Sequence, residues 1–222
     1  MGEVFKVWDE ETHALRFIKR VQINSKDHAS LRREAQIYSK LMNRNFAHVV
    51  TVHEVERDEA YMGLVLDFAE GGTLQRHVPQ VGLASSKEVK SIATQIGTGL
   101  RELHHLDVVH RDLKPANVLR HNAAWKLADF GIAKDTGVHG TTTFKGHFTP
   151  GYAAPEQINS TEATPSADVY SFGKVITLML TGGTDPDQIR FPDWQYLVRR
   201  CTDRNPDERP SASEVLKEIS RL

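Results

Sequence analysis

The 222-residue sequence predicts an α+β fold with two lobes, a small β-rich lobe with one helix and a larger helical lobe. Segments that alternate apolar and polar residues, as strands do, occupy most of residues 1–68. The stretch Glu70-Gly71-Gly72-Thr73 interrupts this pattern, because paired glycines favour neither helices nor strands. Beyond it, apolar residues recur at helical spacing. We therefore expect a single domain over 1–222 whose lobes are residues 1–68 and 69–222.

The first lobe is expected to hold two hairpins and a helix. β-branched and aromatic residues are frequent in its strand-like segments, and short polar turns join these segments in pairs. The segments are residues 4–8, 14–21, 49–55 and 61–66. Between the two pairs, apolar residues recur at helical spacing from Ala29 to Met42.

Helices of the second lobe are indicated by their ends as well as by their apolar stripes. Ser85 and Glu88 have the spacing of a capping box, and so do Ser211 and Glu214. The Gly182-Gly183 pair is a typical helix stop. The predicted helices span residues 85–103, 167–180, 194–201 and 215–219.

Composition excludes several classes of function. Lys and Arg number 28 against 29 for Asp and Glu, so no electrostatic argument favours a nucleic-acid or membrane-surface binder. No apolar run approaches the roughly 20 residues of a membrane-spanning helix. The single Cys201 cannot form an intramolecular disulfide, and no leader-like segment opens the chain. We expect a protein of the reducing cytoplasm.

Two polar motifs carry the chemistry. The run His110-Arg111-Asp112-Leu113-Lys114-Pro115-Ala116-Asn117 follows the long helix, and Asp129-Phe130-Gly131 follows one strand later. Phosphoryl transfer requires groups that hold a polyphosphate and a metal, and a carboxylate that orients the attacking hydroxyl. Asp112, Asn117 and Asp129 supply the oxygen ligands that Mg²⁺ prefers. The two motifs therefore predict a phosphoryl-transfer site.

Together these motifs resemble those of the eukaryotic-type (Hanks-type) Ser/Thr protein kinases, and the resemblance extends from about Gly2 to the C-terminus. It implies the two-lobed protein-kinase fold and transfer of the ATP γ-phosphate to Ser or Thr of a protein substrate, with Mg²⁺. Lys114 and the Thr149-Pro150 pair before Tyr152 resemble the Ser/Thr branch of the family rather than the Tyr branch. The stretches 130–134 and 150–156 are similar to those of bacterial members.

The resemblance assigns roles in the chemical step. Asp112 would orient or accept the proton of the substrate hydroxyl, and Lys114 would neutralise charge on the transferred phosphoryl group. Lys19 would hold the α- and β-phosphates and pair with Glu34, fifteen residues later on the following helix. These four are the expected catalytic residues.

The resemblance also assigns the nucleotide and metal sites. Asn117 and Asp129 would bind Mg²⁺. The residues expected around ATP are Gly2, Val4, Lys19, Asp67, Ala69, Leu119 and Asp129, with the hinge at Asp67-Phe68-Ala69 beside the adenine.

Six more positions match residues with which the family supports its site: His110, Arg111, Thr149, Glu156, Asp168 and Arg209. Arg209 would pair with Glu156 at the end of the activation segment, and Asp168 would brace the catalytic loop. Thr149 would hydrogen-bond to Asp112 and Lys114, and His110 would be a buried scaffold of the loop.

Arg111 would bind a phosphate on the activation segment, because guanidinium groups form charge-assisted bidentate bonds. The expected acceptors are Thr141, Thr142 and Thr143, so we predict autophosphorylation there. The simpler alternative is that this threonine run is a polar loop.

The sequence departs from the family pattern in three places. The family's phosphate-covering loop has three glycines, and the chain begins at what matches the last of them, Gly2. Phe17 stands where the family has Ala in the roof over adenine, so its ring would intrude into that space unless it turns aside. The stretch 182–191 leaves little room for the usual docking helix. We expect weakened ATP affinity, or a protein partner that activates the domain or completes the nucleotide site.

Two alternatives to an active Ser/Thr kinase follow from these departures and from the motifs. One is a pseudokinase-like binding or inhibitory module without a full glycine-rich loop. The other is a small-molecule phosphotransferase such as an antibiotic kinase, which also has an Asp and Asn catalytic loop. Ala154-Pro155-Glu156 and Lys114 argue against the second.

Overall fold

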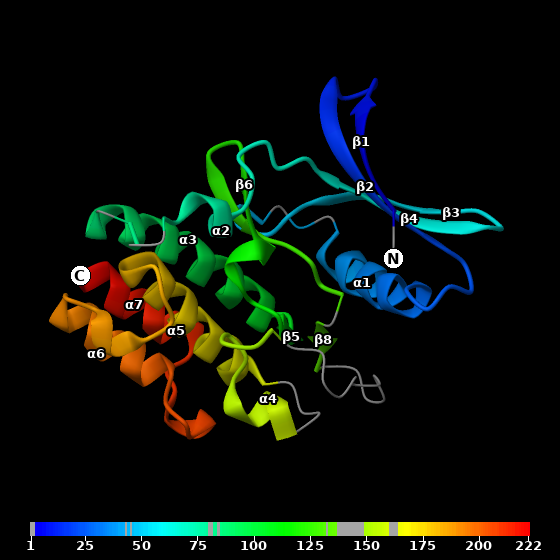
Figure 1. Cartoon of the computed structure of the whole chain (residues 1–222). Coiled ribbons are helices and arrows are strands. Elements are labelled where there is room, and N and C mark those ends of the chain that lie inside the picture. The colour runs from blue at the N-terminus through cyan, green and yellow to red at the C-terminus, as the bar shows by residue number, and fades with distance from the viewer. Residues whose placement is uncertain are drawn as a thin grey trace.

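A computed structural model places a twisted sheet with one helix beside a larger bundle of helices (Figure 1). It describes residues 3–42, 44, 46–79, 82–83, 85–131, 133–136, 149–159 and 164–222. The predicted α+β fold with a sheet-containing N-terminal lobe and a helical C-terminal lobe is confirmed.

The sheet of the N-terminal lobe is antiparallel, with the strand order β1-β2-β4-β3. The elements of this lobe are β1 Glu3–Asp9, β2 Ala14–Gln22, α1 His28–Leu41, β3 Val52–Arg57 and β4 Tyr61–Asp67. Lys19 lies on the central strand β2, opposite Val4 of β1 and Leu64 of β4. Both predicted hairpins are therefore present.

Helix α1 packs against β2 and β4 through one face. Leu31, Ala35 and Tyr38 are buried on it, at the spacing of an amphipathic helix. Glu34 shares this face and is only 2% exposed. The helix thus brings one carboxylate under the sheet, close to β2.

The described part of the C-terminal lobe contains α-helices and short strands, and its last element is α7. Its elements are α2 Leu74–His77, α3 Ser86–His104, β5 Val108–Val109, η1 Pro115–Asn117, β6 Val118–His121, β7 Ala124–Leu127, β8 Lys134–Asp135, α4 Pro155–Asn159, α5 Pro165–Thr181, η2 Pro186–Gln188, α6 Pro192–Cys201, η3 Pro206–Glu208 and α7 Ala212–Arg221. Two-stranded pairs form between β5 and β8 and between β6 and β7.

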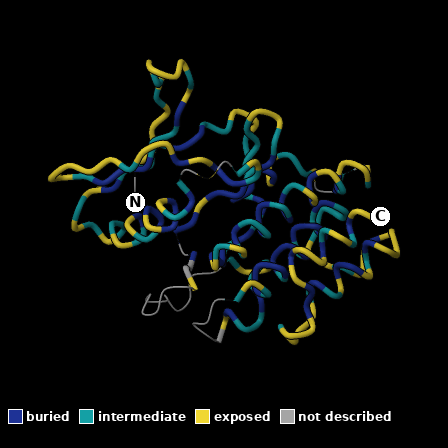
Figure 2. The backbone as a smooth tube through the Cα atoms, turned by 180° about the vertical axis from the view of Figure 1, so that it is seen from behind, coloured by how far each residue is buried: buried dark blue, intermediate teal, exposed yellow. Residues whose placement is uncertain are grey.

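The core of this lobe is formed around α5. Val169, Phe172 and Ile176 on α5 have no exposed surface, and α3 and α6 pack against this helix. Figure 2 shows the buried interior of the helical lobe and the exposed tip of the β1–β2 hairpin. Burial of apolar surface is the main stabilising contribution in such a core, so this lobe gives the loops above it a rigid support.

Most predicted elements are present, with small shifts at their ends. Strand β3 begins at Val52 rather than at Val49, because Val49 and Val50 pair with Leu127 of the other lobe, Val50 donating to its carbonyl at 2.9 Å. Gly182 ends α5 in the left-handed conformation, with φ of 77°. No helix in the described part of the chain is long and apolar enough to span a bilayer.

Candidate active site

A cleft of about 430 Å³ lies at the junction of the two lobes. It is lined by seven of the residues predicted for nucleotide and metal binding, namely Val4, Lys19, Asp67, Ala69, Asn117, Leu119 and Asp129. Gly2 lies outside the described residues. The cleft therefore collects these positions from β1, β2, the hinge and the loops next to β6 and β7.

Lys19 joins the lobes electrostatically. Its Nζ lies 2.6 Å from Oε2 of Glu34 and 3.3 Å from Oδ1 of Asp129. Burial alone would lower the pKa of Lys19, but the two carboxylates outweigh it and raise the pKa. Burial would raise the pKa of Asp129, but the charge of Lys19 outweighs it and lowers that pKa. The ammonium group and the Asp129 carboxylate thus stay charged at neutral pH.

Glu34 is held in place by the contact of α1 with the Asp129-Phe130-Gly131 loop. Ser30 of α1 donates to the carbonyl of Gly131 at 3.0 Å. Phe130 is fully buried and its ring contacts that of Tyr38 edge-on, with centroids 5.0 Å apart. Burial raises the pKa of Glu34, as expected for a carboxylate removed from water.

In the loop predicted to be catalytic, the side chains of Asp112, Lys114 and Thr149 bond to one another. Nζ of Lys114 donates to Oδ2 of Asp112 at 2.7 Å and to Oγ1 of Thr149 at 2.8 Å, and the Thr149 hydroxyl donates to Oδ1 of Asp112 at 2.8 Å. These are the contacts expected of Thr149. Nδ2 of Asn117 donates to the carbonyl of Asp112 at 2.9 Å and to its Oδ2 at 3.1 Å. No described residue donates a hydrogen bond to the amide oxygen of Asn117.

Asp168 fixes the backbone of this loop from below. Its fully buried carboxylate accepts hydrogen bonds from the amides of His110 and Arg111, both at 2.8 Å, and from Nε2 of His104 at 2.9 Å. Burial would raise the pKa of Asp168, but the hydrogen bond and charge of His104 outweigh it and lower the pKa. Arg111 has a left-handed φ of 69°, and so does Asp129 with 66°. Such backbone strain persists only where the surroundings impose it.

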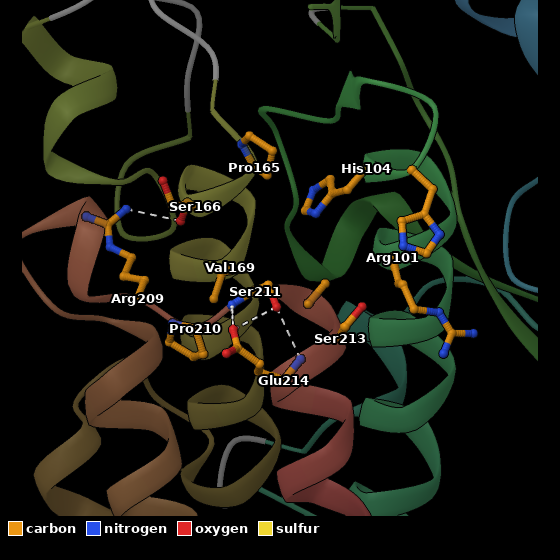
Figure 3. A pocket seen from close by; sticks show the side chains of 12 residues that line it. Arg101, His104, Pro165, Ser166, Val169, Arg209, Pro210, Ser211, Ser213 and Glu214 are labelled. Carbon is orange, nitrogen blue, oxygen red and sulfur yellow. Dashed lines mark hydrogen bonds between the residues drawn. The ribbon is translucent and has the colours of Figure 1, made fainter.

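A second ion pair ties the end of the activation segment to the helical core. Arg209 donates to both carboxylate oxygens of Glu156, at 2.6 and 2.9 Å, and to the carbonyl of Ser166 at 3.1 Å. Figure 3 shows Arg209 and His104 at the rim of a second cavity, of about 470 Å³, between α3, α5 and α7. The Ser211 and Glu214 capping box, complete as predicted, also lines this cavity.

Comparison with known sequences decides the family. The model of the protein kinase domain matches residues 1–188. The chain belongs to the protein kinase family. The predicted resemblance is therefore confirmed.

Relatives of this kinase domain support the same assignment. It is 30% identical to ribosomal protein S6 kinase alpha-3 of Mus musculus over 232 residues, which cover 95% of the chain and 31% of that relative. It is also 30% identical to a probable serine/threonine-protein kinase of Dictyostelium discoideum, over 98% of the chain and 43% of the relative. Mitogen-activated protein kinase kinase kinase 3 of Arabidopsis thaliana is 30% identical over 97% and 40%, respectively. The chain thus spans about a third to two fifths of these relatives.

The departures of this kinase domain from the family pattern are visible in the structure. Phe17 lines the cleft and lies opposite Leu66 in the β2–β4 register. Between α5 and α6 the described residues form only the three-residue η2 turn, as the short sequence predicted.

Arg111 has hydrogen-bonding capacity to spare. It is 7% exposed, and among the described residues its Nε has no hydrogen-bond partner. Burial lowers its pKa, although Asp168 lies nearby. Thr141, Thr142 and Thr143 lie outside the described residues.

Sequence reasoning missed two contributors to this site, His104 and Tyr38. His104 pairs with Asp168 and Tyr38 packs on Phe130, but partners separated by 64 and 92 positions give no local signal. His110, predicted as a buried scaffold, is fully buried, and its Nε2 donates to the carbonyl of Ala128 at 3.1 Å. The side chain of Asp67 was expected only near a nucleotide, yet basic side chains from both lobes surround it.

Proposed function

We propose that this chain is the catalytic domain of a Ser/Thr protein kinase that transfers the γ-phosphoryl group of ATP to protein hydroxyls. One observation carries the proposal. Lys19 of the sheet lobe lies 3.3 Å from Asp129 of the helical lobe, in a cleft whose floor includes Asn117. A cation and oxygen ligands facing one another across a hinge can hold a polyphosphate between them.

The residues of the cleft fit Mg²⁺ and ATP. Asp129 and Asn117 offer a carboxylate and an amide oxygen, the hard ligands that Mg²⁺ takes. Mg²⁺, when bound, would neutralise charge on the phosphates. The ammonium group of Lys19, held by Glu34 at 2.6 Å, is placed to contact the phosphates directly.

Asp112 performs the proton step in this proposal. One of its oxygens accepts from Thr149 and the other from Lys114, which fixes the plane of the carboxylate. A substrate hydroxyl placed beside it would be oriented for in-line attack and would lose its proton to Asp112 as the new P–O bond forms. Lys114, released toward the phosphoryl group, would neutralise its charge.

The substrate class is a proposal from resemblance and relatives. Lys114 and Thr149 match the Ser/Thr branch, and several relatives carry serine/threonine or protein kinase names. Protein substrates are general to the family. The comparisons give no support to a pseudokinase-like module.

The decisive experiment measures transfer of labelled γ-phosphate to a generic basic protein, followed by identification of the phosphorylated amino acids. We expect phosphoserine and phosphothreonine with the natural chain and a loss of about 10³-fold or more with Asp112→Asn. The control Asp193→Asn changes an exposed carboxylate of α6 and should be fully active. Equal transfer by Asp112→Asn and the natural chain would refute the proposal.

We also propose that phosphate on the threonine run 141–143 docks on Arg111. The spare Nε of this buried guanidinium supports the proposal. Incubation with MgATP should add phosphate to the intact mass of the natural chain but not to that of Thr141→Val/Thr142→Val/Thr143→Val. Absence of any added mass in the natural chain would contradict it.

An activating partner and a cytoplasmic setting stay predictions. Phe17 in the cleft supports the need for a partner, and the buried, free Cys201 is consistent with a reducing compartment. A cell extract that lowers the KM for ATP would indicate that an activating partner exists.

A further inference from the structure

Asp67 is the last residue of β4 and the first of the hinge, and its side chain is only 7% exposed. Nε2 of His53 lies 2.7 Å from its Oδ1, and Nζ of Lys126 lies 3.0 Å from its Oδ2. Nη1 of Arg16 lies 3.5 Å from Oδ1 and adds a third basic group. A single buried carboxylate thus has three basic partners.

These partners come from both lobes. Arg16 is on β2 and His53 on β3, in the sheet lobe, whereas Lys126 is on β7 of the helical lobe. His121 of β6 lies 3.8 Å from the same carboxylate. Asp67 therefore connects the two lobes by ionic contacts at the point where the chain passes from one to the other.

The residues that follow are held from the helical lobe as well. Nδ1 of His121 donates to the carbonyl of Phe68 at 2.7 Å and lies 3.1 Å from Oε2 of Glu70. The amide of Asn122 donates to Oε1 of Glu70 at 2.5 Å. Asp67, Phe68 and Glu70 of the hinge are thus held by residues of the β6–β7 hairpin.

Such a cluster stabilises one arrangement of the lobes, because moving the lobes apart would separate the buried carboxylate from its partner in the helical lobe. Pulling Lys126 away would leave a buried carboxylate with less compensation, and removing the carboxylate would leave the basic side chains Arg16 and Lys126 without their shared partner. Backbone hydrogen bonds from Val50 to the carbonyl of Leu127 and from Leu127 to the carbonyl of His48 already join the lobes, so the ionic contacts act on the angle between the lobes rather than on their attachment.

We propose that the Asp67 side chain is a positioning residue that clamps the hinge and thereby sets the distance from Lys19 to Asp129. The clamp consists of Asp67, His53, Arg16 and Lys126. By holding the lobes at this angle, it keeps both walls of the cleft ready for ATP before ATP binds. The consequence for ATP affinity rests on the proposed kinase function, whereas the consequence for lobe geometry does not.

The geometric test uses two spin labels, one on each lobe. Glu59→Cys in the β3–β4 turn and Lys217→Cys on α7 are exposed, and the natural Cys201 is fully buried with its pKa raised by burial to about 12, so it should not react. We expect a narrow distance distribution in this background. Asp67→Asn and Lys126→Gln should each broaden it, while Asp58→Asn, which removes an exposed partner of Arg20 within the sheet lobe, should leave it unchanged.

The kinetic test measures KM and kcat separately. Asp67→Asn and Lys126→Gln should each raise the KM for ATP about tenfold and change kcat at saturating ATP by less than about threefold. The KM for ATP of the double variant should be no higher than that of Asp67→Asn, because both substitutions remove the same contact between Asp67 and Lys126. Lys126→Gln keeps Asp67 paired within the sheet lobe, so it also provides a folded variant if Asp67→Asn is unstable.

The results separate the two proposals. If the natural chain fails to transfer phosphate, the spin-label distances still decide whether the clamp exists. Unchanged distances in both variants, or a lower melting temperature with an unchanged KM, would reduce the cluster to a structural role. Additive effects in the double variant would show that Lys126 acts independently of Asp67, and would overturn the clamp.

Discussion

The kinase domain has two cavities of similar volume, about 430 Å³ at the hinge and about 470 Å³ between α3, α5 and α7, but their charges are arranged differently. In the hinge cleft, Lys19 and Asp129 come from different lobes and face the open space. In the second cavity (Figure 3), Arg209, His104 and Glu214 are already bonded to Glu156, Asp168 and Ser211. The two cavities therefore differ in the arrangement of their charges and not in their volume. Charges from separate lobes converge in the hinge cleft, as phosphoryl transfer requires, whereas those of the second cavity stabilise the helical lobe.

The largest expected effect comes from the cation of the cleft. Lys19→Met removes the ammonium group that contacts Glu34 and Asp129, so kcat/KM for ATP should fall about 10²- to 10³-fold. Lys87→Met, an exposed change on α3, is the matched control. A Lys19→Met variant with full activity would remove the cleft from the chemistry.

Substitutions beside the second cavity should change the free energy of unfolding. Glu156→Gln leaves the fully buried Arg209 side chain without its carboxylate, which should lower the free energy of unfolding by about 3 kcal/mol in urea titrations. Glu218→Gln breaks a surface pair with Arg200 and should cost about 0.5 kcal/mol or less. Equal losses for the two variants would contradict a bracing role for the buried pair.

The hinge beside the cleft should give an acid-dependent effect. Burial opposes ionisation of Asp67, but hydrogen bonds from His53 and Lys126 lower its pKa from 3.8 to about 2. Its contribution is therefore complete above pH 3.8 and is lost as the pH falls toward 2. The difference in unfolding free energy between the natural chain and Asp67→Asn should shrink by about 2 kcal/mol over this range. A difference independent of pH would contradict the ion-pair account.

The smallest effect is expected at an unpaired lining position of the second cavity. The Ser213 side chain is exposed and forms no hydrogen bond to a described residue, so Ser213→Ala should change stability by less than about 0.5 kcal/mol and leave activity intact. Thr149→Val, the comparable loss of a hydroxyl in the cleft, should reduce kcat because Asp112 and Lys114 lose their shared partner. Equal activities of Ser213→Ala and Thr149→Val would contradict the proposed difference between the two cavities.

Elements with local signals could be predicted from the sequence. The capping box at Ser211 and Glu214 and the Gly182 stop are properties of adjacent residues, so they mark helix ends without tertiary information. The strands β5 and β8 are two residues long and exist only because distant segments meet, which no periodicity reveals. The β-branched residues Val49 and Val50 predicted the start of a strand. In the structure they pair instead with Leu127, an extended pairing that suits the same residue types.

The site shows the same division. The motifs around Asp112 and Asp129 could be predicted because their spacing is short and specific to the family. The contacts that orient them, such as His104 with Asp168 and Lys126 with Asp67, join residues about 60 positions apart. Such pairs depend on packing, which a single sequence does not encode in any local pattern.

Titration of ATP into the purified chain, with and without Mg²⁺, tests the central claim most directly. If Lys19, Asn117 and Asp129 form one nucleotide and metal site, ATP should bind with a dissociation constant of about 1 mM or tighter in Mg²⁺, and Asp129→Asn should abolish the dependence on the metal. Binding that ignores both Mg²⁺ and Asp129→Asn, or no binding at all, would contradict the account.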